Sequence, residues 1–430
     1  MYALVYIAVV VAAVGSAALP SRGWYNAEVP QNPLQQIDTD THGISVSLSE
    51  DSILNITQTA INVFLQSKRD DGLIRGLTYW QVANGYTAIA LHDAWTNTTA
   101  FADQLDELIG KVETNQPDCV NDMNDDSMWW SICSLDMFDL THQPKYLKMS
   151  EAIWEHVNGY VIPHGKYIIN GVDMEGGVMW SNRTAETQVN AITTGLYAEL
   201  SARLSRLRGD GDDEQSRRRL LASAIRSFSW ILRATFDPHE SLVLDHIDLQ
   251  SHRAYNWTFT YNTGQAIAAA VAIYRAMRHA TRLDLLQAQT ATATATAYLD
   301  LACTMARTAM TRSAWVDGNG TLTEPGAYPG TGPNRKQAYE NDDAVGFKAI
   351  LLRSLAKLYR VLLRDGSYPD MQTRLLAFIT QQYRSLQDRD TNGKGQYGPW
   401  WDGPMVLPTS HSQLAALDVM AAIHAWFGDT

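Results

Sequence analysis

The sequence predicts an all-α protein whose helices, about twelve in number, pair into six helical hairpins arranged in a closed ring. Apolar residues recur with helical spacing from about Asp51 to the end of the 430-residue chain. No strand-like alternation is long enough to indicate a major sheet, and no linker divides the chain. With 45% hydrophobic and only 19% charged residues, the composition is sufficient for one large buried core.

The predicted helices follow one another at short intervals. In order, they span residues 51–66, 79–94, 100–112, 126–140, 146–158, 184–206, 214–235, 261–280, 283–311, 342–363, 369–385 and 411–426. An alternating Thr-Ala run over 290–297 lies inside a helical pattern, and we interpret it as a low-complexity helix start. Long connections rich in Gly, Trp, Asp and Tyr, where function is usually mounted on a helical scaffold, lie at 159–183, 236–260, 312–341 and 386–410.

The N-terminus predicts secretion. Residues 1–18 form an apolar stretch of signal-peptide length that ends in small residues and is short for a membrane span. Glycosylation sequons at Asn55, Asn97, Asn182, Asn256 and Asn319 fit a secreted glycoprotein. The last residues lack the hydrophobic tail of a glycolipid-anchor signal. We therefore expect a signal peptide over 1–18 and one extracellular catalytic domain over 19–430, monomeric and without a stable membrane anchor.

Charge and composition exclude several classes of function. A net charge of −12 and a pI near 5.3 argue against nucleic acid as a partner. The 11 histidines are scattered, and Cys119, Cys133 and Cys303 lack zinc spacing and permit at most one disulfide. We therefore expect no metal and no other cofactor. Trp and Tyr (13 and 19 residues) outnumber Phe (9), which favours the flat amphipathic surfaces that sugar-binding clefts use.

Two adjacent carboxylates, Asp125 and Asp126, stand at the head of a predicted helix in the run NDDSMWW. Capping is one explanation, since Asn, Asp and Ser favour helix N-termini and the same NDD triplet recurs at 341–343. However, the helix behind the pair is apolar nearly all round, which predicts burial and makes paired acids costly. Glycoside hydrolysis gives a reason for the pair, because it needs one protonated and one ionised carboxyl group. Mutual repulsion raises one pKa, while the helix N-terminus stabilises the other charge.

The segment NDDSMWWSICSLDMFDLTHQPKYL, residues 124–147, resembles the signature helix of glycoside hydrolase family 76, the α-1,6-mannanases. Further segments resemble the family's motifs in the same order, over roughly 78–416. They are Tyr79-Trp80-Gln81 with Asn84, Gly176-Gly177-Val178-Met179-Trp180 with Asn190-Ala191-Ile192, Tyr261-Asn262-Thr263-Gly264, Asp343 with Phe347-Lys348, and GPWWDGP from Gly398 to Pro404. The departures, such as Thr263 and Met179, concern details of the sugar subsites more than the class of reaction.

The resemblance implies an (α/α)6 barrel and a secreted, fungal-type, retaining endo-α-1,6-mannanase that acts on α-1,6-mannan or manno-oligosaccharides. It implies that Asp125 is the nucleophile and Asp126 the general acid/base. The residues that it places along the substrate groove are Trp80, Gln81, Asn84, Trp129, Trp130, Trp180, Tyr261, Asn262, Asp343, Lys348, Trp401 and Asp402. Structural roles remain open for these residues: the Trp side chains can be core, and Lys348 can pair with Asp343.

Other functions fit the same residues. A transglycosylase that remodels cell-wall mannan or a mannose-containing anchor would use the two acids with a sugar hydroxyl in place of water. A non-catalytic mannan-binding protein could retain the barrel. Inverting glycosidases and sugar epimerases also use six-hairpin folds, but inverting enzymes need carboxylates separated widely enough to admit a water, which adjacent residues supply less naturally.

Overall fold

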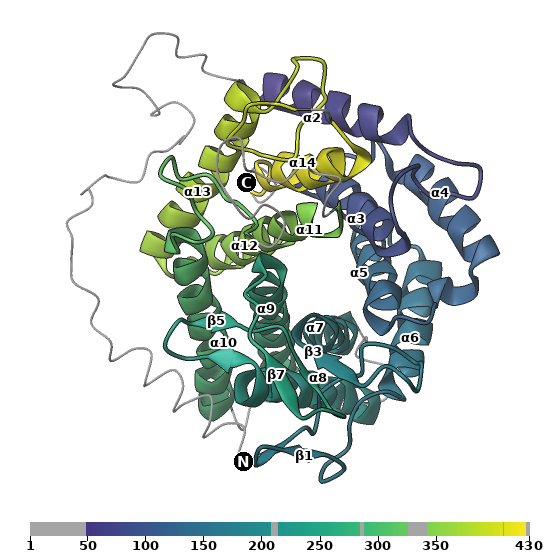
Figure 1. Ribbon diagram of the computed structural model, residues 1–430, viewed down its shortest axis with the longest axis vertical. Coiled ribbons are helices and arrows are strands. Elements are labelled where there is room, and N and C mark those ends of the chain that lie inside the picture. The colour runs from purple at the N-terminus through teal and green to yellow at the C-terminus, as the bar shows by residue number, and fades with distance from the viewer. Residues whose placement is uncertain (1–48, 208–213, 284–287, 326–341, 407, 427–430) are drawn as a thin grey trace.

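The computed structural model describes residues 49–207, 214–283, 288–325, 342–406 and 408–426. In these ranges the helices form two concentric rings, which is an (α/α)6 barrel (Figure 1). Each inner helix contacts the next, and the last contacts the first, so the inner ring is closed. The inner helices are α3 (Tyr79–Trp95), α5 (Asn124–Thr141), α7 (Ala191–Leu207), α9 (Thr260–Leu283), α12 (Phe347–Arg364) and α14 (Ser410–Ala422).

The outer ring alternates with the inner ring along the chain. Most outer helices pack between two inner ones, as α8 does between α7 and α9. The outer helices are α2 (Glu50–Leu65), α4 (Ala102–Asn115), α6 (Pro144–Asn158), α8 (Glu214–Ala234), α10 (Ala288–Thr311) and α13 (Pro369–Arg389). The predicted ring of six hairpins is therefore confirmed.

Burial separates the two kinds of helix. Outer helix α4 buries one stripe, Leu105, Leu108, Ile109 and Val112, at the spacing of a single helix face. Inner helix α5 instead buries almost every residue from Asn124 to Met137, because it is surrounded by other helices. The all-round apolar pattern of this helix in the sequence therefore indicated its place in the inner ring.

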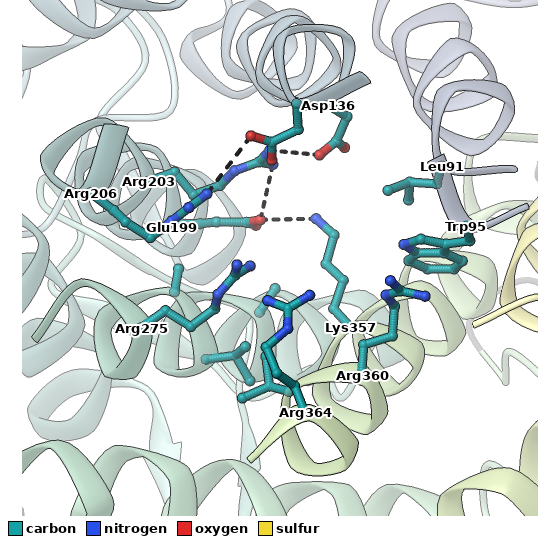
Figure 2. Close-up of a pocket in the computed structure, with 15 residues that line it drawn as sticks. Leu91, Trp95, Asp136, Glu199, Arg203, Arg206, Arg275, Lys357, Arg360 and Arg364 are labelled. Carbon is teal, nitrogen blue, oxygen red and sulfur yellow. Dashed lines mark hydrogen bonds and ion pairs between the residues drawn. The ribbon is translucent and has the colours of Figure 1, made fainter. Parts of the chain in front are cut away.

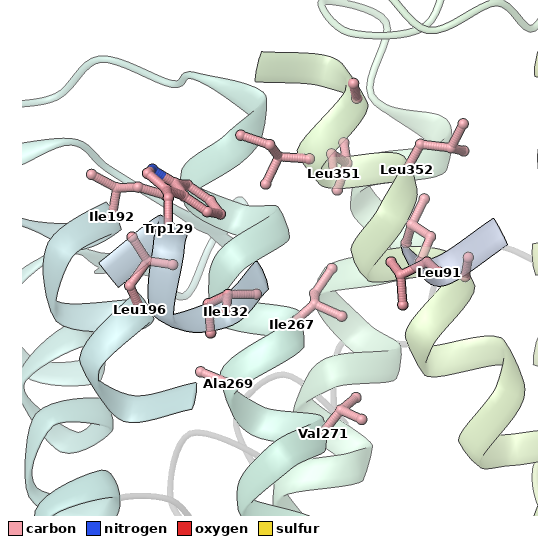
Figure 3. Close-up of a cluster of buried hydrophobic side chains, with 14 of the residues drawn as sticks. Leu91, Trp129, Ile132, Ile192, Leu196, Ile267, Ala269, Val271, Leu351 and Leu352 are labelled. Atoms are coloured by element: carbon pink, nitrogen blue, oxygen red, sulfur yellow. The ribbon is translucent and has the colours of Figure 1, made fainter. Parts of the chain in front are cut away.

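Side chains from four inner helices meet in one buried hydrophobic cluster. Figure 3 shows Ile132 of α5, Leu196 of α7, Ile267 of α9 and Leu351 of α12 in this cluster. Helices α9 and α12 approach so closely that a Cβ on Gly264 would lie 2.7 Å from the Cα of Leu351. Only glycine fits there, which gives the Tyr-Asn-Thr-Gly segment a packing role.

The connections differ from the prediction at two places. The helix expected at 184–206 begins at Ala191, because residues 188–190 form strand β3 (Gln188–Asn190). This strand pairs antiparallel with β6 (His246–Asp248), which pairs with β7 (Arg253–Tyr255). The helix expected at 342–363 is divided at Gly346 into α11 (Asp342–Val345) and α12. Two further short hairpins are β1 (Ile168–Ile169) with β2 (Val172–Asp173), and β4 (Phe236–Asp237) with β5 (Leu242–Val243).

Three further predictions concern the signal peptide, a membrane anchor and a disulfide. The predicted signal peptide, residues 1–18, lies outside the described residues. None of the described helices combines the length and the apolar character that a membrane crossing requires. Cys119, Cys133 and Cys303 are all buried as free thiols, so the one disulfide that the sequence permitted is not formed.

A buried ion pair connects three consecutive inner helices. The guanidinium group of Arg353 on α12 donates to both carboxylate oxygens of Asp418 on α14, at 2.7 and 2.8 Å. It also donates to the side-chain oxygen of Asn84 on α3 at 2.7 Å and to the backbone carbonyl of Asn84 at 3.1 Å. Both charged side chains are buried, so each depends on these partners to compensate for the loss of water.

We predict that Arg353→Met lowers the free energy of unfolding by about 3–5 kcal/mol, because it leaves the Asp418 carboxylate buried without its cation. The double variant Arg353→Met/Asp418→Leu should recover most of this loss, since it removes both charges. Chemical denaturation measures both values. Lys111→Ala, which breaks an exposed ion pair with Glu107, is the control and should leave the midpoint unchanged. Equal destabilisation by the single and double variants would contradict the assignment.

Candidate active site

The starts of the inner helices meet at one end of the barrel. Trp80, in the first turn of α3, lies 6.2 Å between ring centroids from Trp129 near the start of α5. It lies 6.1 Å from Phe347, the first residue of α12. Tyr261, at the start of α9, stacks on Phe347 with ring centroids 4.0 Å apart and planes within 10°. The partial positive charges of several helix N-termini therefore converge here, which favours negatively charged groups.

A loop pinned to the start of α5 positions the first acid, Asp125. The backbone N–H of Asn124 donates to the carbonyl of Trp180 at 2.8 Å, and the Asn124 side chain donates to the carbonyl of Met179 at 2.8 Å. This pairing brings the Trp180 indole N–H to 2.9 Å from one Asp125 oxygen. The other Asp125 oxygen accepts the backbone N–H of Asp126 at 2.9 Å. Two donors thus face Asp125.

Asp126 has a different environment. One of its oxygens accepts the side-chain N–H of Asn121 at 3.0 Å. Asn121 is itself fixed, because its side-chain oxygen accepts the backbone N–H of Met123 at 2.8 Å and its backbone N–H donates to the Ser127 hydroxyl at 3.0 Å. The sequence reasoning did not identify Asn121, although it lies only four residues before the acid pair.

Both acids are hard to ionise. Burial raises the pKa of Asp125 well above its ordinary value, and the charge of Asp126 raises it further. Burial also raises the pKa of Asp126 to about 6; the hydrogen bond from Asn121 opposes this shift, and the charge of Asp343 adds to it. Two carboxyl groups this close titrate as a pair, so the site retains a proton under mildly acidic conditions.

Burial and hydrogen bonding have opposite effects on the protonation of Asp125. Burial favours its protonated form, whereas the indole and backbone N–H groups favour the carboxylate. A ligand that covered the site would remove water from both acids alike, and the number of donors would then decide. Asp125 has two such donors and Asp126 has one, so the hydrogen bonds favour the charge on Asp125 and the proton on Asp126.

Aromatic and acidic groups extend the site beyond the pair. The Trp80 indole N–H donates to Asp343 at 3.1 Å, which joins α3 to α11. The pKa of Tyr261 is raised well above its ordinary value by burial and by surrounding carboxylates that include Asp125 and Asp343. The raised pKa indicates that the Tyr261 hydroxyl lies in the same negatively charged region as the acid pair. Asp402 is half-buried in the loop that precedes α14.

A second group of residues beside this region was not predicted. Tyr255 of β7 stacks on His246 of β6, with ring centroids 4.2 Å apart. The side chain of Asp245 lies 2.8 Å from His246 Nδ1 and accepts from Asn262 of α9 at 2.8 Å. Trp257 is 53% exposed and continues this aromatic surface through Phe259 to Tyr261. The aromatic run RAYNWTFTY, residues 253–261 at the end of the long 236–260 connection, was the available signal.

The structure buries half of the residues expected along the groove. Six of the twelve are at most 2% exposed, and in this structure they contact protein groups. They are Gln81, Asn84, Trp130, Asn262, Lys348 and Trp401. Trp129 is 3% exposed, while Trp80, Trp180, Tyr261, Asp343 and Asp402 retain more exposure. The buried residues of these motifs therefore pack beneath the residues that remain exposed at the site.

The contacts of these buried residues explain their place in the motifs. The Gln81 side chain accepts the backbone N–H of Thr78 at 2.9 Å and so fixes the start of α3. The Lys348 ammonium group donates to the carbonyl of Pro399 at 2.6 Å and lies 4.8 Å above the Trp401 ring. These contacts hold the loop between α13 and α14, which contains Pro399 and Trp401, against the start of α12. Trp130 packs on Tyr79 and Tyr86, in the core.

One group in the described part of the chain has side chains spaced to hold a metal ion. His164, Asp173 and Glu175 place one ligand atom each within 4.8 Å of one another. His164 Nδ1 lies 2.8 Å from Asp173 and 3.3 Å from Glu175. A histidine flanked by two carboxylates also forms ordinary ion pairs when it is protonated, and this exposed group takes no part in the contacts of the acid pair.

Comparisons with known proteins agree with this arrangement. The sequence profile of glycosyl hydrolase family 76 matches residues 52–425. No curated protein gives a match. One similar solved structure is an inactive variant of the α-1,6-mannanase GH76A of Salegentibacter sp. HEL1_6, with two consecutive aspartates changed to alanine, in complex with α-1,6-mannotetrose. Its TM-score is 0.69 at 20% identity, covering 86% of this chain and 98% of that chain.

Two further solved structures share the fold. Dfg5 from Chaetomium thermophilum, in complex with glucosamine, has a TM-score of 0.66 at 13% identity and covers 88% of this chain and 92% of that one. The family 76 mannosidase Bt3792 from Bacteroides thetaiotaomicron has a TM-score of 0.61 at 14% identity, covering 87% and 98%. At these identities the likeness establishes a common fold.

The raised pKa of Asp126 predicts that Asp126→Asn stabilises the protein at pH 7. The folded protein holds a proton that the unfolded chain has released, so stability is present at pH 4 and is lost as the pH rises through about 6. The gain should be on the order of 1–3 kcal/mol at pH 7 and should vanish near pH 4. Denaturant unfolding at both pH values measures it.

Asp122→Asn is the matched control. The Asp122 carboxylate lies 2.8 Å from Arg183, which lowers its pKa, so its removal should bring no gain in stability at pH 7. If Asp126→Asn stabilised the protein equally at pH 4 and pH 7, the pKa of this carboxyl group would not be raised in the folded state.

Proposed function

Since the chain belongs to glycosyl hydrolase family 76, we propose that it is a retaining endo-α-1,6-mannanase with Asp125 as nucleophile and Asp126 as general acid/base. Membership makes the chain a glycoside hydrolase, and the linkage and the roles of the two acids are the proposal. The observation that carries it is the difference in hydrogen bonding between two adjacent half-buried acids: Asp125 receives two hydrogen-bond donors and Asp126 one.

The geometry supports a two-step displacement. Asp126 would donate its proton to the glycosidic oxygen while an Asp125 oxygen attacks the anomeric carbon, so that the glycosidic bond breaks and a glycosyl ester forms. Asp126, now ionised, would then remove a proton from water, which attacks the same carbon and releases Asp125. The Trp180 N–H would hold the Asp125 carboxylate in one orientation throughout.

The choice of substrate rests on the aromatic surfaces and on the similar structures. Trp80, Trp180 and Tyr261 present partly exposed rings beside the acids, and such rings stack on the C–H-rich faces of sugars. The Salegentibacter enzyme is described as an α-1,6-mannanase and binds α-1,6-mannotriose and α-1,6-mannotetrose. We extend that linkage to this chain as part of the proposal.

The setting of the reaction is also part of the proposal. We propose a secreted, fungal-type, monomeric enzyme whose signal peptide spans 1–18 and whose catalytic domain begins after it. In support, the sequon asparagines Asn55, Asn97, Asn256 and Asn319 are exposed, so oligosaccharyl transfer could reach them, while Asn182 is half-buried. Its substrate would be extracellular mannan.

We predict that Asp126→Asn lowers the rate of α-1,6-mannan hydrolysis by about 10²–10⁴-fold, the usual contribution of a general acid. Asp125→Asn should lose still more, because no covalent intermediate can form. Chromatography of released manno-oligosaccharides measures the rate, and circular dichroism checks the fold. Asp122→Asn, the exposed neighbouring acid, should keep near-normal activity. Near-normal activity in either active-site variant would refute the roles, and chain-lengthened products would indicate a transglycosylase.

The pKa of Asp126 also predicts the pH dependence. A general acid must be protonated, so kcat/KM should fall as the pH rises above about 6. Asn121→Asp keeps the side-chain oxygen that accepts from Met123 but replaces the donor to Asp126 with a negative charge. The pKa of Asp126 should then rise, and the falling limb should move to higher pH. If the falling limb stays in place or moves to lower pH, the ionisation that it reports is not that of Asp126.

A further inference from the structure

A cavity of about 120 Å³ lies at the other end of the barrel from the acid pair (Figure 2). Its walls are the C-terminal parts of α3, α5, α7 and α12 and the middle of α9. Along α5, Asp136 in this wall is eleven residues beyond Asp125, which is ~17 Å of helix. The cavity is therefore separate from the proposed active site.

The cavity is basic although the chain has a net charge of −12. Basic side chains from three inner helices line it, twice as many as the acidic ones. The basic residues are Arg203, Arg206, Arg275, Lys357, Arg360 and Arg364. Such a concentration of cations within an acidic protein indicates a site that attracts anions.

The acidic groups of the cavity are already paired with two of these cations. Glu199 accepts from the Lys357 ammonium group at 2.9 Å and from the Gln265 amide at 2.8 Å. Arg203 lies 2.7 Å from an Asp136 oxygen and 3.1 Å from an Asp139 oxygen. Arg206 lies 3.8 Å from the other Asp139 oxygen, and Arg360 donates to the backbone carbonyl of Ala425 at 3.0 Å.

Arg275 takes no part in these ion pairs. Among the described residues, its guanidinium group makes no hydrogen bond and no ion pair, and its pKa is lowered to about 10 by burial and by the charges of Arg206 and Arg364. Figure 2 shows Arg275 and Arg364 directed into the same space below Glu199 and Lys357. A partly buried cation facing other cations is unfavourable unless an anion joins them.

Helix polarity explains only part of this cluster. Arg206 and Arg364 lie in the last turns of α7 and α12, where the partial negative charge of a helix end favours a cation. Arg275 lies eight residues before the end of α9, so the polarity of its own helix does not account for it. The charge of Asp139 opposes the fall in the Arg275 pKa only in part, so a further anion at this position would stabilise the cation.

We propose that the cavity binds a small, doubly charged oxyanion of the phosphate or sulfate class between Arg275, Arg364 and Arg206. Planar guanidinium groups donate paired N–H bonds to such oxyanions, and arginine is suited to this geometry. The volume of about 120 Å³ is below that of pockets for drug-sized ligands, which favours a small ion. The bound ion would connect α7, α9 and α12 and stabilise this end of the barrel.

The test is the thermal unfolding midpoint of the whole protein at pH 7, titrated with sodium phosphate or sodium sulfate while sodium chloride holds the ionic strength constant. The wild type should show a saturable rise in Tm. Arg275→Ala should raise Tm in chloride alone, because it removes the repulsion, and should weaken phosphate binding at least about tenfold, as expected for loss of a charge-assisted contact. Arg278→Ala, on the exposed surface of the same helix, is the control and should bind like the wild type.

Two further experiments identify the ligand and test whether a folding defect explains the loss in Arg275→Ala. Arg275→Gln keeps most of the side chain and should show the same loss as Arg275→Ala. A response to inorganic ions but not to glycerol 2-phosphate assigns a free ion, whereas a response to both assigns a phosphate group that esters can supply. The site is refuted if neither phosphate nor sulfate gives a saturable response, or if both Arg275 variants respond like the wild type.

Discussion

The common direction of the inner helices is the constraint on which both ends of this barrel depend. Each inner helix has a partial positive charge at its start and a partial negative charge at its end. Asp125, Asp126 and Asp343 gather where the helices start, while Arg206 and Arg364 lie where two of them end. One architectural feature thus makes one end suitable for acids and the other for cations, before any particular reaction is considered.

The acid pair nevertheless needs more than helix polarity. Burial opposes ionisation of both carboxyl groups. Hydrogen-bond donors oppose this effect, and their number differs between the two acids. The loop pinned at Asn124 presents the Trp180 indole to Asp125, and Asn121 serves Asp126. The catalytic assignment therefore depends on loop-to-helix contacts as much as on the acids, and the buried motif residues matter because they hold those contacts in place.

Much of this could be predicted from the sequence, and the remainder has physical reasons. Helical periodicity predicted the ring, because it showed about twelve helices in succession without a linker or a major sheet. The acid pair was recognisable because two charges preceded a helix with no polar face. Strands of two or three residues, such as β3, are too short to show alternation. Burial of Lys348 and Asn84 could not be predicted, because their partners Pro399 and Arg353 are distant in sequence. The basic cavity arises only when the ring closes and brings Arg275 beside Arg364.

The most direct test of the central claim is to identify the residue that becomes covalently attached to the substrate. The protein is incubated with a mannose-configured epoxide extended by an α-1,6-linked mannose, digested, and analysed by peptide mass spectrometry. A retaining mechanism with Asp125 as nucleophile predicts one label per chain, located on Asp125 and absent from the Asp125→Asn variant. Attachment to Asp126 or to another residue, or an unlabelled protein that releases product with inverted anomeric configuration, would contradict the account.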